Sequence, residues 1–232
     1  MAQTPESTGE SPLPGSGEPR PEPPPPAAAR GRLLAWALVL ILALAPRLHN
    51  LDAPPLDANH VRQSDTASIA RIMAREGIDL LHPRIDWAGP EAGTVESELP
   101  LYAAAVAAGW SLRGGPERPS WAWPRGLSLL AWLAGALALA AWVRRRLPDS
   151  PLHYLWLYAL SPLGVVFSRN VQPDALAIAL FLWGCELADA MSERPGLRGL
   201  SGALFGGSLA GLEVASKDQL AFLLPQIGRA HV

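Results

Sequence analysis

The chain has 232 residues, of which 49% are hydrophobic and only 17% are charged, and nine of them are tryptophan. This composition departs from that of an average soluble domain and predicts a membrane protein. The formal charge of −2 offers no basic surface to a phosphate backbone, so nucleic-acid binding is not expected. A single cysteine, Cys185, can form neither an internal disulfide nor a cysteine-based metal site, which disfavours redox chemistry.

The N-terminal part of the chain is a proline-rich tail followed by an apolar run. Residues 1–30 hold almost nothing that could fill a core, and we expect a disordered cytoplasmic tail there. Residues 31–48 are just long enough to cross a hydrocarbon layer of about 30 Å as a helix. The long proline-rich leader favours a signal anchor over a cleaved signal peptide.

Residues 49–98 break the apolar pattern and hold more acidic than basic side chains, which predicts a long loop on the outer side of the membrane. Within this loop, residues 64–76 place apolar side chains at helical spacing and predict an amphipathic helix at the membrane surface. The apolar segments that follow are separated by proline, glycine and charge, and they cover residues 99–112, 126–143, 152–167, 175–190 and 200–224.

Charge gives the expected direction of these segments. The three arginines at 144–146 and the turn at 193–198 should face the cytoplasm by the positive-inside rule. Arg125 and residues 168–174 then lie outside, and the short segment 99–112 is a surface or re-entrant helix. The alternative, in which this segment spans, puts the three arginines outside. We therefore expect an all-α fold, a polytopic transmembrane helical bundle that passes several times through the plasma (inner) membrane.

The last six residues, 227–232, match the translation of a common sequencing adapter. We interpret them as an artefact of sequence assembly and leave them out of the fold. The membrane domain is therefore expected to cover residues 31–226 and to be the N-terminal part of a longer natural protein.

The outer loop supplies the first candidates for chemistry. Asp65 is the sharpest, because a carboxylate at the edge of a bilayer can take a proton from an acceptor hydroxyl or amine. The structural alternative is that Ser64 or Asp65 is the N-cap of the predicted helix. Glu96 and Glu98 could, with His60, ligate a divalent ion, and the alternative is that both are solvated loop acids.

Ionisable residues near the ends of the apolar segments are also informative, because charge is costly there. Arg169 and Asp174 flank a tight turn. They either pair with each other or leave Arg169, together with Lys217, to bind a lipid-linked phosphate. Glu213 lies four residues before Lys217 and could pair with it instead. Arg125, beside two tryptophans, is expected to be an interfacial anchor.

Several strings in the sequence resemble a known family. They are HVRQSDTASIAR at residues 60–71, PRIDW at 83–87, ESELPLY at 96–102 and the polar turn within 161–174. These strings resemble the protein O-mannosyltransferases and the aminoarabinose-transferase-like glycosyltransferases, which are integral membrane enzymes of the GT-C fold. The similarity covers about residues 32–226. Thr66 is a departure, since many relatives carry Glu directly after the first aspartate.

The resemblance implies an enzyme that moves a sugar, a hexose or modified pentose, from a polyprenyl-phosphate carrier to a lipid or protein acceptor on the outer face of the membrane. It implies that Asp65 is catalytic and that Glu98 is a second acidic position, which in some relatives helps to bind a metal ion. The donor phosphate would be bound by Arg169 and Lys217. Support for the acceptor and the loop would come from His60, Arg62, Glu96 and Asp174. The alternative function is a non-catalytic polytopic transporter or scaffold.

Overall fold

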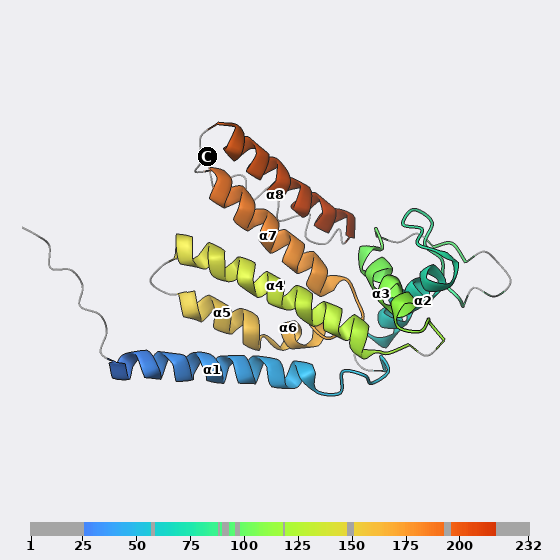
Figure 1. Ribbon diagram of the computed structural model, residues 1–232, viewed down its shortest axis with the longest axis horizontal. Helices are drawn as coiled ribbons and strands as arrows, with labels where there is room; N and C mark the ends of the chain where they lie inside the picture. The colour runs from blue at the N-terminus through green and yellow to red at the C-terminus, as the bar shows by residue number, and fades with distance from the viewer. Residues whose placement is uncertain are drawn as a thin grey trace, which may run out of the picture. The chain divides into compact units, whose positions relative to one another are not determined.

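The computed structural model describes residues 26–56, 59–87, 89, 93–95, 98–117, 119–147, 151–192 and 196–216. Its helices are shown in Figure 1 and are α1 (Pro26–Leu48), α2 (His60–Glu76), α3 (Leu101–Leu112), α4 (Ala122–Arg146), α5 (Pro151–Leu160), α6 (Pro162–Phe167), α7 (Asp174–Ser192) and α8 (Leu197–Ser216). The only β-structure in these ranges is an isolated antiparallel bridge between Arg84 and Thr94. The all-α expectation is therefore confirmed for the part of the chain that the structure describes.

The chain divides into two compact units between Ala37 and Leu38. The first unit contributes the N-terminal part of α1 to the described residues, and the second begins at Leu38. Helix α1 starts at Pro26, five residues before the predicted span, because proline fits the first helical turn, where its missing amide hydrogen is not needed. The rest of the predicted tail, residues 1–25, lies outside the described residues, as do residues 227–232.

One helix, α4, is long and apolar enough to cross a membrane by its length and composition. The apolar part of α1 at Ala37–Leu48 and the whole of α3 are shorter. No further helix meets both criteria among the residues that were placed. A membrane location thus has the support of one helix.

The predicted segment 152–167 forms two helices rather than one. Helix α5 ends at Leu160 and α6 begins at Pro162, which cannot donate a hydrogen bond back to α5. Between them, the Ser161 hydroxyl accepts a hydrogen bond from the Gly164 amide at 3.3 Å. A serine cap followed by proline is a typical helix start. The apolar run is therefore interrupted where its sequence changes from Leu160 to Ser-Pro.

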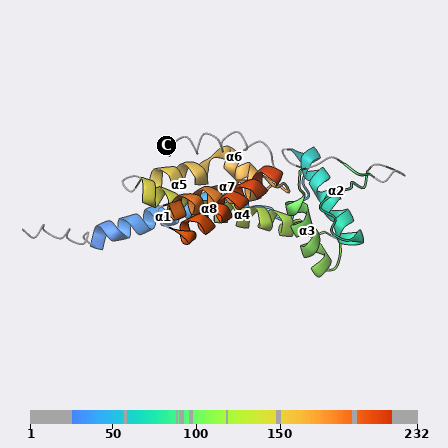
Figure 2. The same ribbon diagram turned by 90° about the horizontal axis from the view of Figure 1, so that it is seen from above.

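Two clusters of buried side chains organise the second unit. In the first, α2 packs on α3, and its buried members include Ala70, Met73, Val106, Trp110 and Val171. In the second, α4 packs on α7 and on the end of α1, and its members include Val39, Ala43, Leu129, Trp132, Ala175 and Ala179. Helix α4 also lies against α5, and α7 lies against α8, as Figures 1 and 2 show.

Ion pairs join α4 and α7 near their C-terminal ends. Arg145 contacts Glu186 at 2.6 Å and Asp189 at 3.2 Å, and Arg146 also pairs with Asp189. The side chains of Glu186 and Asp189 are only 10% and 4% exposed, so removing Arg145 would take away the arginine partner of Glu186 and one of the two arginine partners of Asp189. The basic end of α4 therefore has a structural role in addition to the orienting role that the sequence predicts.

Candidate functional site

Asp65 lies in the second turn of α2 and does not cap the helix. The N-cap residue is Asn59, which has a left-handed backbone (φ 61°) and makes no hydrogen bond from its side chain. The interpretation of Ser64 or Asp65 as the cap is therefore wrong, because the amides that need a cap belong to the first turn, four residues earlier. The carboxylate of Asp65 is free of that structural task.

The indole of Trp87 is the side chain that contacts Asp65. Its Nε1 donates a hydrogen bond to Asp65 Oδ1 at 3.2 Å, across a sequence separation of 22 residues. Among the residues with described side chains, Asp65 has no other hydrogen-bond partner. Trp87 was not predicted as a site residue, although an aromatic side chain in an acidic loop is the signal that could have drawn attention to it.

Asp86 fixes the backbone next to Trp87. Ser68 Oγ donates to Asp86 Oδ1 at 2.6 Å and accepts from the Asp86 amide at 2.7 Å, and Arg71 Nη1 donates to Oδ2 at 2.6 Å. Burial opposes ionisation of this carboxyl group, but the hydrogen bonds from Ser68 and Arg71 and the charge of Arg71 outweigh it and hold the pKa of Asp86 below its usual value. The loop that carries Trp87 is therefore tied to α2.

Glu98 lies beside α2. Its Oε1 is 3.6 Å from Nη2 of Arg62, which is three residues before Asp65 on α2. The two side chains are 35% and 57% exposed, so this pair contributes little to stability, roughly 1 kcal/mol at most. Its consequence is positional, since it brings the second acidic residue to the helix that carries the first.

The metal-binding role of Glu98 stays a prediction, because one of the proposed ligands lies outside the described residues. The nearest charged partner of Glu98 is the Arg62 guanidinium, which would repel a second cation. Among the described residues, no group of three or more His, Cys, Asp or Glu side chains is arranged to hold a metal ion. Glu96, the other predicted acidic ligand, lies outside the described residues, and His60 is exposed at the first position of α2.

Arg169 binds the backbone at the C-terminal end of α1. Its Nη1 donates to the Pro46 carbonyl at 2.9 Å, and its Nη2 donates to the His49 carbonyl at 2.7 Å. Asp174 is the first residue of α7. Lys217 and the side chain of Glu213 lie outside the described residues, so their predicted pairing has no structural counterpart to compare.

A buried glutamine joins the Arg169 turn to α2. Gln63 is fully buried, and its Oε1 accepts a hydrogen bond from the Val171 amide at 2.9 Å. Gln63 is two residues before Asp65 in α2, and Val171 is two residues after Arg169. The predicted acid and the predicted phosphate-binding cation thus belong to segments that are in direct contact.

Asp52 connects the loop after α1 to the start of α4. Its Oδ1 accepts a hydrogen bond from the Ala122 amide at 3.0 Å and another from Ser120 Oγ at 3.1 Å. The bond from the Ala122 amide, followed by that from Ser120, lowers the pKa of Asp52. Asp52 therefore serves as a helix cap for α4 from a distant part of the sequence.

Arg125 is a core residue, and the prediction that it is an interfacial anchor is wrong. Its side chain is 1% exposed, and Nη2 donates to the Pro54 carbonyl at 3.4 Å. The loop after α1 covers it, because Asp52 holds that loop on the start of α4. The spacing of residues around Arg125 could not predict its burial, because the loop that covers it is about 70 residues away in the sequence.

Arg47 is a second cation that was not predicted as a site residue. It is fully buried at the end of α1, and its guanidinium lies 3.9 Å from the centre of the Trp132 ring. Nε donates to Ser168 Oγ at 2.8 Å and Nη1 to the Ala43 carbonyl at 2.6 Å. The cation is thus stabilised by an aromatic face and two hydrogen bonds. Its sequence signal was a charge placed directly after an apolar run.

None of the family models, curated proteins or solved structures that were compared with the chain matches it.

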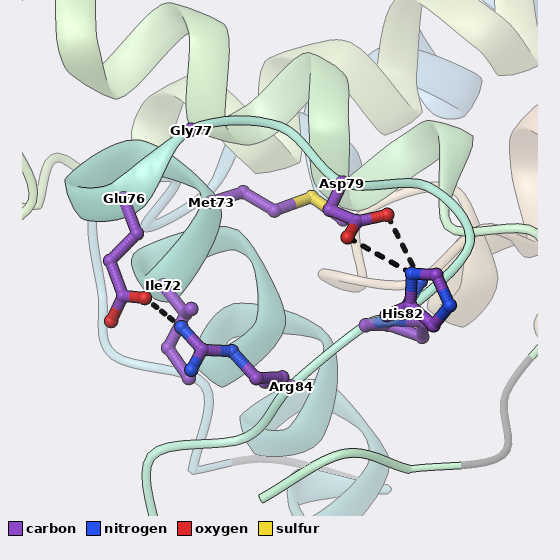
Figure 3. Close-up of a pocket in the computed structure, with 8 residues that line it drawn as sticks. Ile72, Met73, Glu76, Gly77, Asp79, His82 and Arg84 are labelled. Atoms are coloured by element: carbon purple, nitrogen blue, oxygen red, sulfur yellow. Dashed lines mark hydrogen bonds and ion pairs between the residues drawn. The ribbon is translucent and has the colours of Figure 1, made fainter. Parts of the chain in front are cut away.

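A hollow of about 220 Å³ lies at the C-terminal end of α2, away from Asp65. Its lining residues are Ile72, Met73, Glu76, Gly77, Asp79, His82, Pro83 and Arg84. Within this hollow Glu76 pairs with Arg84, and an oxygen of the Asp79 carboxylate lies 3.2 Å from Nδ1 of His82, as Figure 3 shows. No predicted site residue lines this hollow. The candidate site is the surface of α2 around Asp65, where Trp87 contacts Asp65 and Glu98 pairs with Arg62, three residues earlier on the helix.

Proposed function

We propose that this protein is a polytopic membrane glycosyltransferase that moves a sugar, a hexose or modified pentose, from a polyprenyl-phosphate carrier to a lipid or protein acceptor on the outer face of the plasma membrane. The observation that carries the proposal is the state of Asp65. Its carboxylate does not cap the helix and accepts a hydrogen bond from the indole N–H of Trp87. Arg62, which pairs with Glu98, is three residues before Asp65 on the same helix.

The chemistry asked of Asp65 is general base catalysis. The acceptor oxygen or nitrogen forms a bond to the anomeric carbon of the sugar while the bond from that carbon to the phosphate oxygen breaks. Asp65 takes the proton that the acceptor loses, and the polyprenyl phosphate leaves with the bonding electrons. In this proposal Glu98 and Arg62 support Asp65. His60 lies five residues before Asp65 on the same helix.

Cationic groups on the donor side would stabilise the leaving phosphate. Arg169 lies in the turn that Gln63 joins to α2, which is the helix that carries the proposed base. Arginine is well suited to phosphate because its planar group presents several N–H donors. Asp174 follows this turn at the start of α7. Lys217 is assigned the same role as Arg169 on the resemblance alone.

The contacts of the described helices support a multi-pass arrangement. The end of α1, the start of α4 and the turn before α7 are joined by Arg169 and Asp52, so they share one end of the helical layer. The three arginines at the opposite end of α4 would face the cytoplasm. Large apolar side chains that point away from the protein suit a lipid environment, and they include Leu38, Ile41, Leu130, Leu137, Leu204 and Phe205.

The direct test is sugar transfer by the Asp65→Asn variant of the protein, expressed from its complete reading frame and assayed with polyprenyl-phosphate sugars. We expect transfer to fall by at least about a hundredfold, because asparagine is nearly isosteric but cannot accept a proton. The matched control is Asp79→Asn, which changes an exposed carboxylate of the same loop. Its transfer should stay at the wild-type rate.

Full transfer by Asp65→Asn in membranes that contain the variant at normal levels would contradict the catalytic role of Asp65. Absence of transfer by the wild-type protein with every lipid-linked sugar supplied would favour the scaffold or transporter instead.

A further inference from the structure

Trp87 is an exposed loop side chain that also makes a hydrogen bond to Asp65. It is 66% exposed, yet its orientation is fixed by the hydrogen bond from Nε1 to Asp65 Oδ1 at 3.2 Å. Leaving so large an apolar surface in water gains nothing for folding, since burial of that surface is what would stabilise the fold. The exposed face of the indole is therefore available for a ligand.

The backbone that carries Trp87 is held on its N-terminal side. Ile85 is buried, and its amide donates to the Gly93 carbonyl at 2.9 Å. The Val95 amide donates to the Pro83 carbonyl at 3.0 Å, and Asp86 is bound to Ser68 and Arg71. The exposure of Trp87 is thus a property of an anchored loop.

The carboxylate beside the indole retains hydrogen-bonding capacity. An ionised carboxylate has about four acceptor sites on its two oxygens. Trp87 occupies one of them, and the described side chains supply no further donor to Asp65. A ligand on the indole face would therefore meet acceptor oxygens at its edge, from a group that is only half-buried.

We infer that Trp87 and Asp65 form a subsite for a sugar ring, in which the indole stacks on the apolar C–H face of the ring and Asp65 accepts hydrogen bonds from its hydroxyl or amino groups. The C–H groups of a sugar carry small positive charges and suit the negative face of an aromatic ring. This inference rests on the proposed function and deepens it, because it assigns the transferred sugar to the surface next to the base. Trp87 is a binding residue, and it also positions Asp65 through its N–H group.

The test is binding of soluble methyl pyranosides to the purified chain, followed by saturation-transfer NMR on the ring protons. The panel contains methyl mannoside, methyl glucoside, methyl galactoside and methyl 4-amino-4-deoxyarabinoside, and the detergent must lack a sugar headgroup. We expect at least one pyranoside to bind the wild type and to bind Trp87→Ala about tenfold more weakly. Trp87→Phe, which keeps an aromatic face, should retain binding within about threefold.

The matched control is Trp142→Phe, which changes a partly exposed tryptophan on α4 and should bind like the wild type. Circular dichroism checks that each variant is folded. Wild-type binding by Trp87→Ala would overturn the subsite, and so would absence of binding of every pyranoside to the wild type.

Transfer assays separate this inference from the proposed function. Pyranoside binding that depends on Trp87, without transfer by the wild-type protein, would support the sugar subsite and contradict the proposed transferase function. If transfer is lost in Asp65→Asn but both KM and kcat are unchanged in Trp87→Ala, the transferase function is supported and the sugar subsite is contradicted.

Discussion

At the scale of single residues, the candidate site depends on side chains that hold other side chains in place. Asp86 makes no contact with the proposed substrate, but its bonds to Ser68 and Arg71 fix the loop next to Trp87. Trp87 in turn orients Asp65. A change at Asp86 should therefore alter both stability and the geometry of the site.

The pH dependence of stability tests the role of Asp86. Because its folded-state pKa is lowered, Asp86 stabilises the fold above its unfolded-state pKa of about 4, and this contribution is lost as the pH falls through the folded-state pKa. We expect Asp86→Asn to lower the free energy of unfolding by about 1–2 kcal/mol at pH 7. The difference from the wild type should shrink as the pH falls below about 4, measured by thermal unfolding at a series of pH values.

Glu117→Gln is the control for this measurement, because Glu117 also pairs with an arginine of α2 but its side chain is 73% exposed. It should change stability by less than about 0.5 kcal/mol at any pH. A constant difference between Asp86→Asn and the wild type from pH 7 down to pH 3 would argue against the assigned ionisation.

At the scale of helices, α7 and α8 approach closely through small residues. A Cβ atom added at Gly206 would lie 2.7 Å from the carbonyl oxygen of Gly184 and 2.8 Å from the amide nitrogen of Ala188. Both neighbours are backbone atoms of α7, so they cannot move aside without displacing the helix. Small residues at such contacts are typical of helix packing in membranes.

Substitution of Gly206 should therefore separate α7 from α8. We expect Gly206→Val to lower the free energy of unfolding by about 2 kcal/mol, from overpacking against backbone. Gly207→Val is the matched control, since the same substitution one residue later meets no atom within 4 Å. Denaturant unfolding of both variants in the same detergent measures the difference, and equal midpoints would contradict the close contact.

The helices differ in how much of them could be predicted. Runs of apolar residues between polar breaks predicted α3, α4 and α7 to within a few residues at most ends. Ser161 and Pro162 are a typical helix start, but the apolar residues on both sides led to the prediction of a single segment, 152–167, instead of the two helices α5 and α6. The start of α2 could not be predicted, because Asn59 begins the helix through its backbone conformation without a side-chain cap.

At the scale of the whole molecule, the proposed orientation in the membrane makes a prediction about access. In a Cys185→Ala background, Val61→Cys on α2 should react with a membrane-impermeant maleimide in intact cells. Arg144→Cys at the end of α4 should react only after the membrane is permeabilised, because the positive-inside rule puts it in the cytoplasm. Labelling of Arg144→Cys in intact cells would reverse the orientation.

The contacts that build the candidate site are long-range, and for this reason the sequence predicted its acids but not their partners. Asp65 and Glu98 were singled out by residue type and by a resembling motif. The contact of Asp65 with Trp87 and that of Arg169 with the end of α1 depend on the tertiary fold, across 22 and 120 or more residues. Periodicity and spacing carry no information at such separations.

The burial of Arg47 has a consequence for the order of biosynthesis. Its guanidinium is stabilised by Trp132 and Ser168, which the ribosome reaches long after α1 has emerged. In the proposed membrane orientation, α1 until then carries a charge that a lipid bilayer disfavours, and the end of the helix that bears Arg47 would remain near the aqueous boundary or beside the insertion machinery. In that orientation, we expect α1 to reach its final packing only after the chain has been synthesised as far as Ser168, which follows α6.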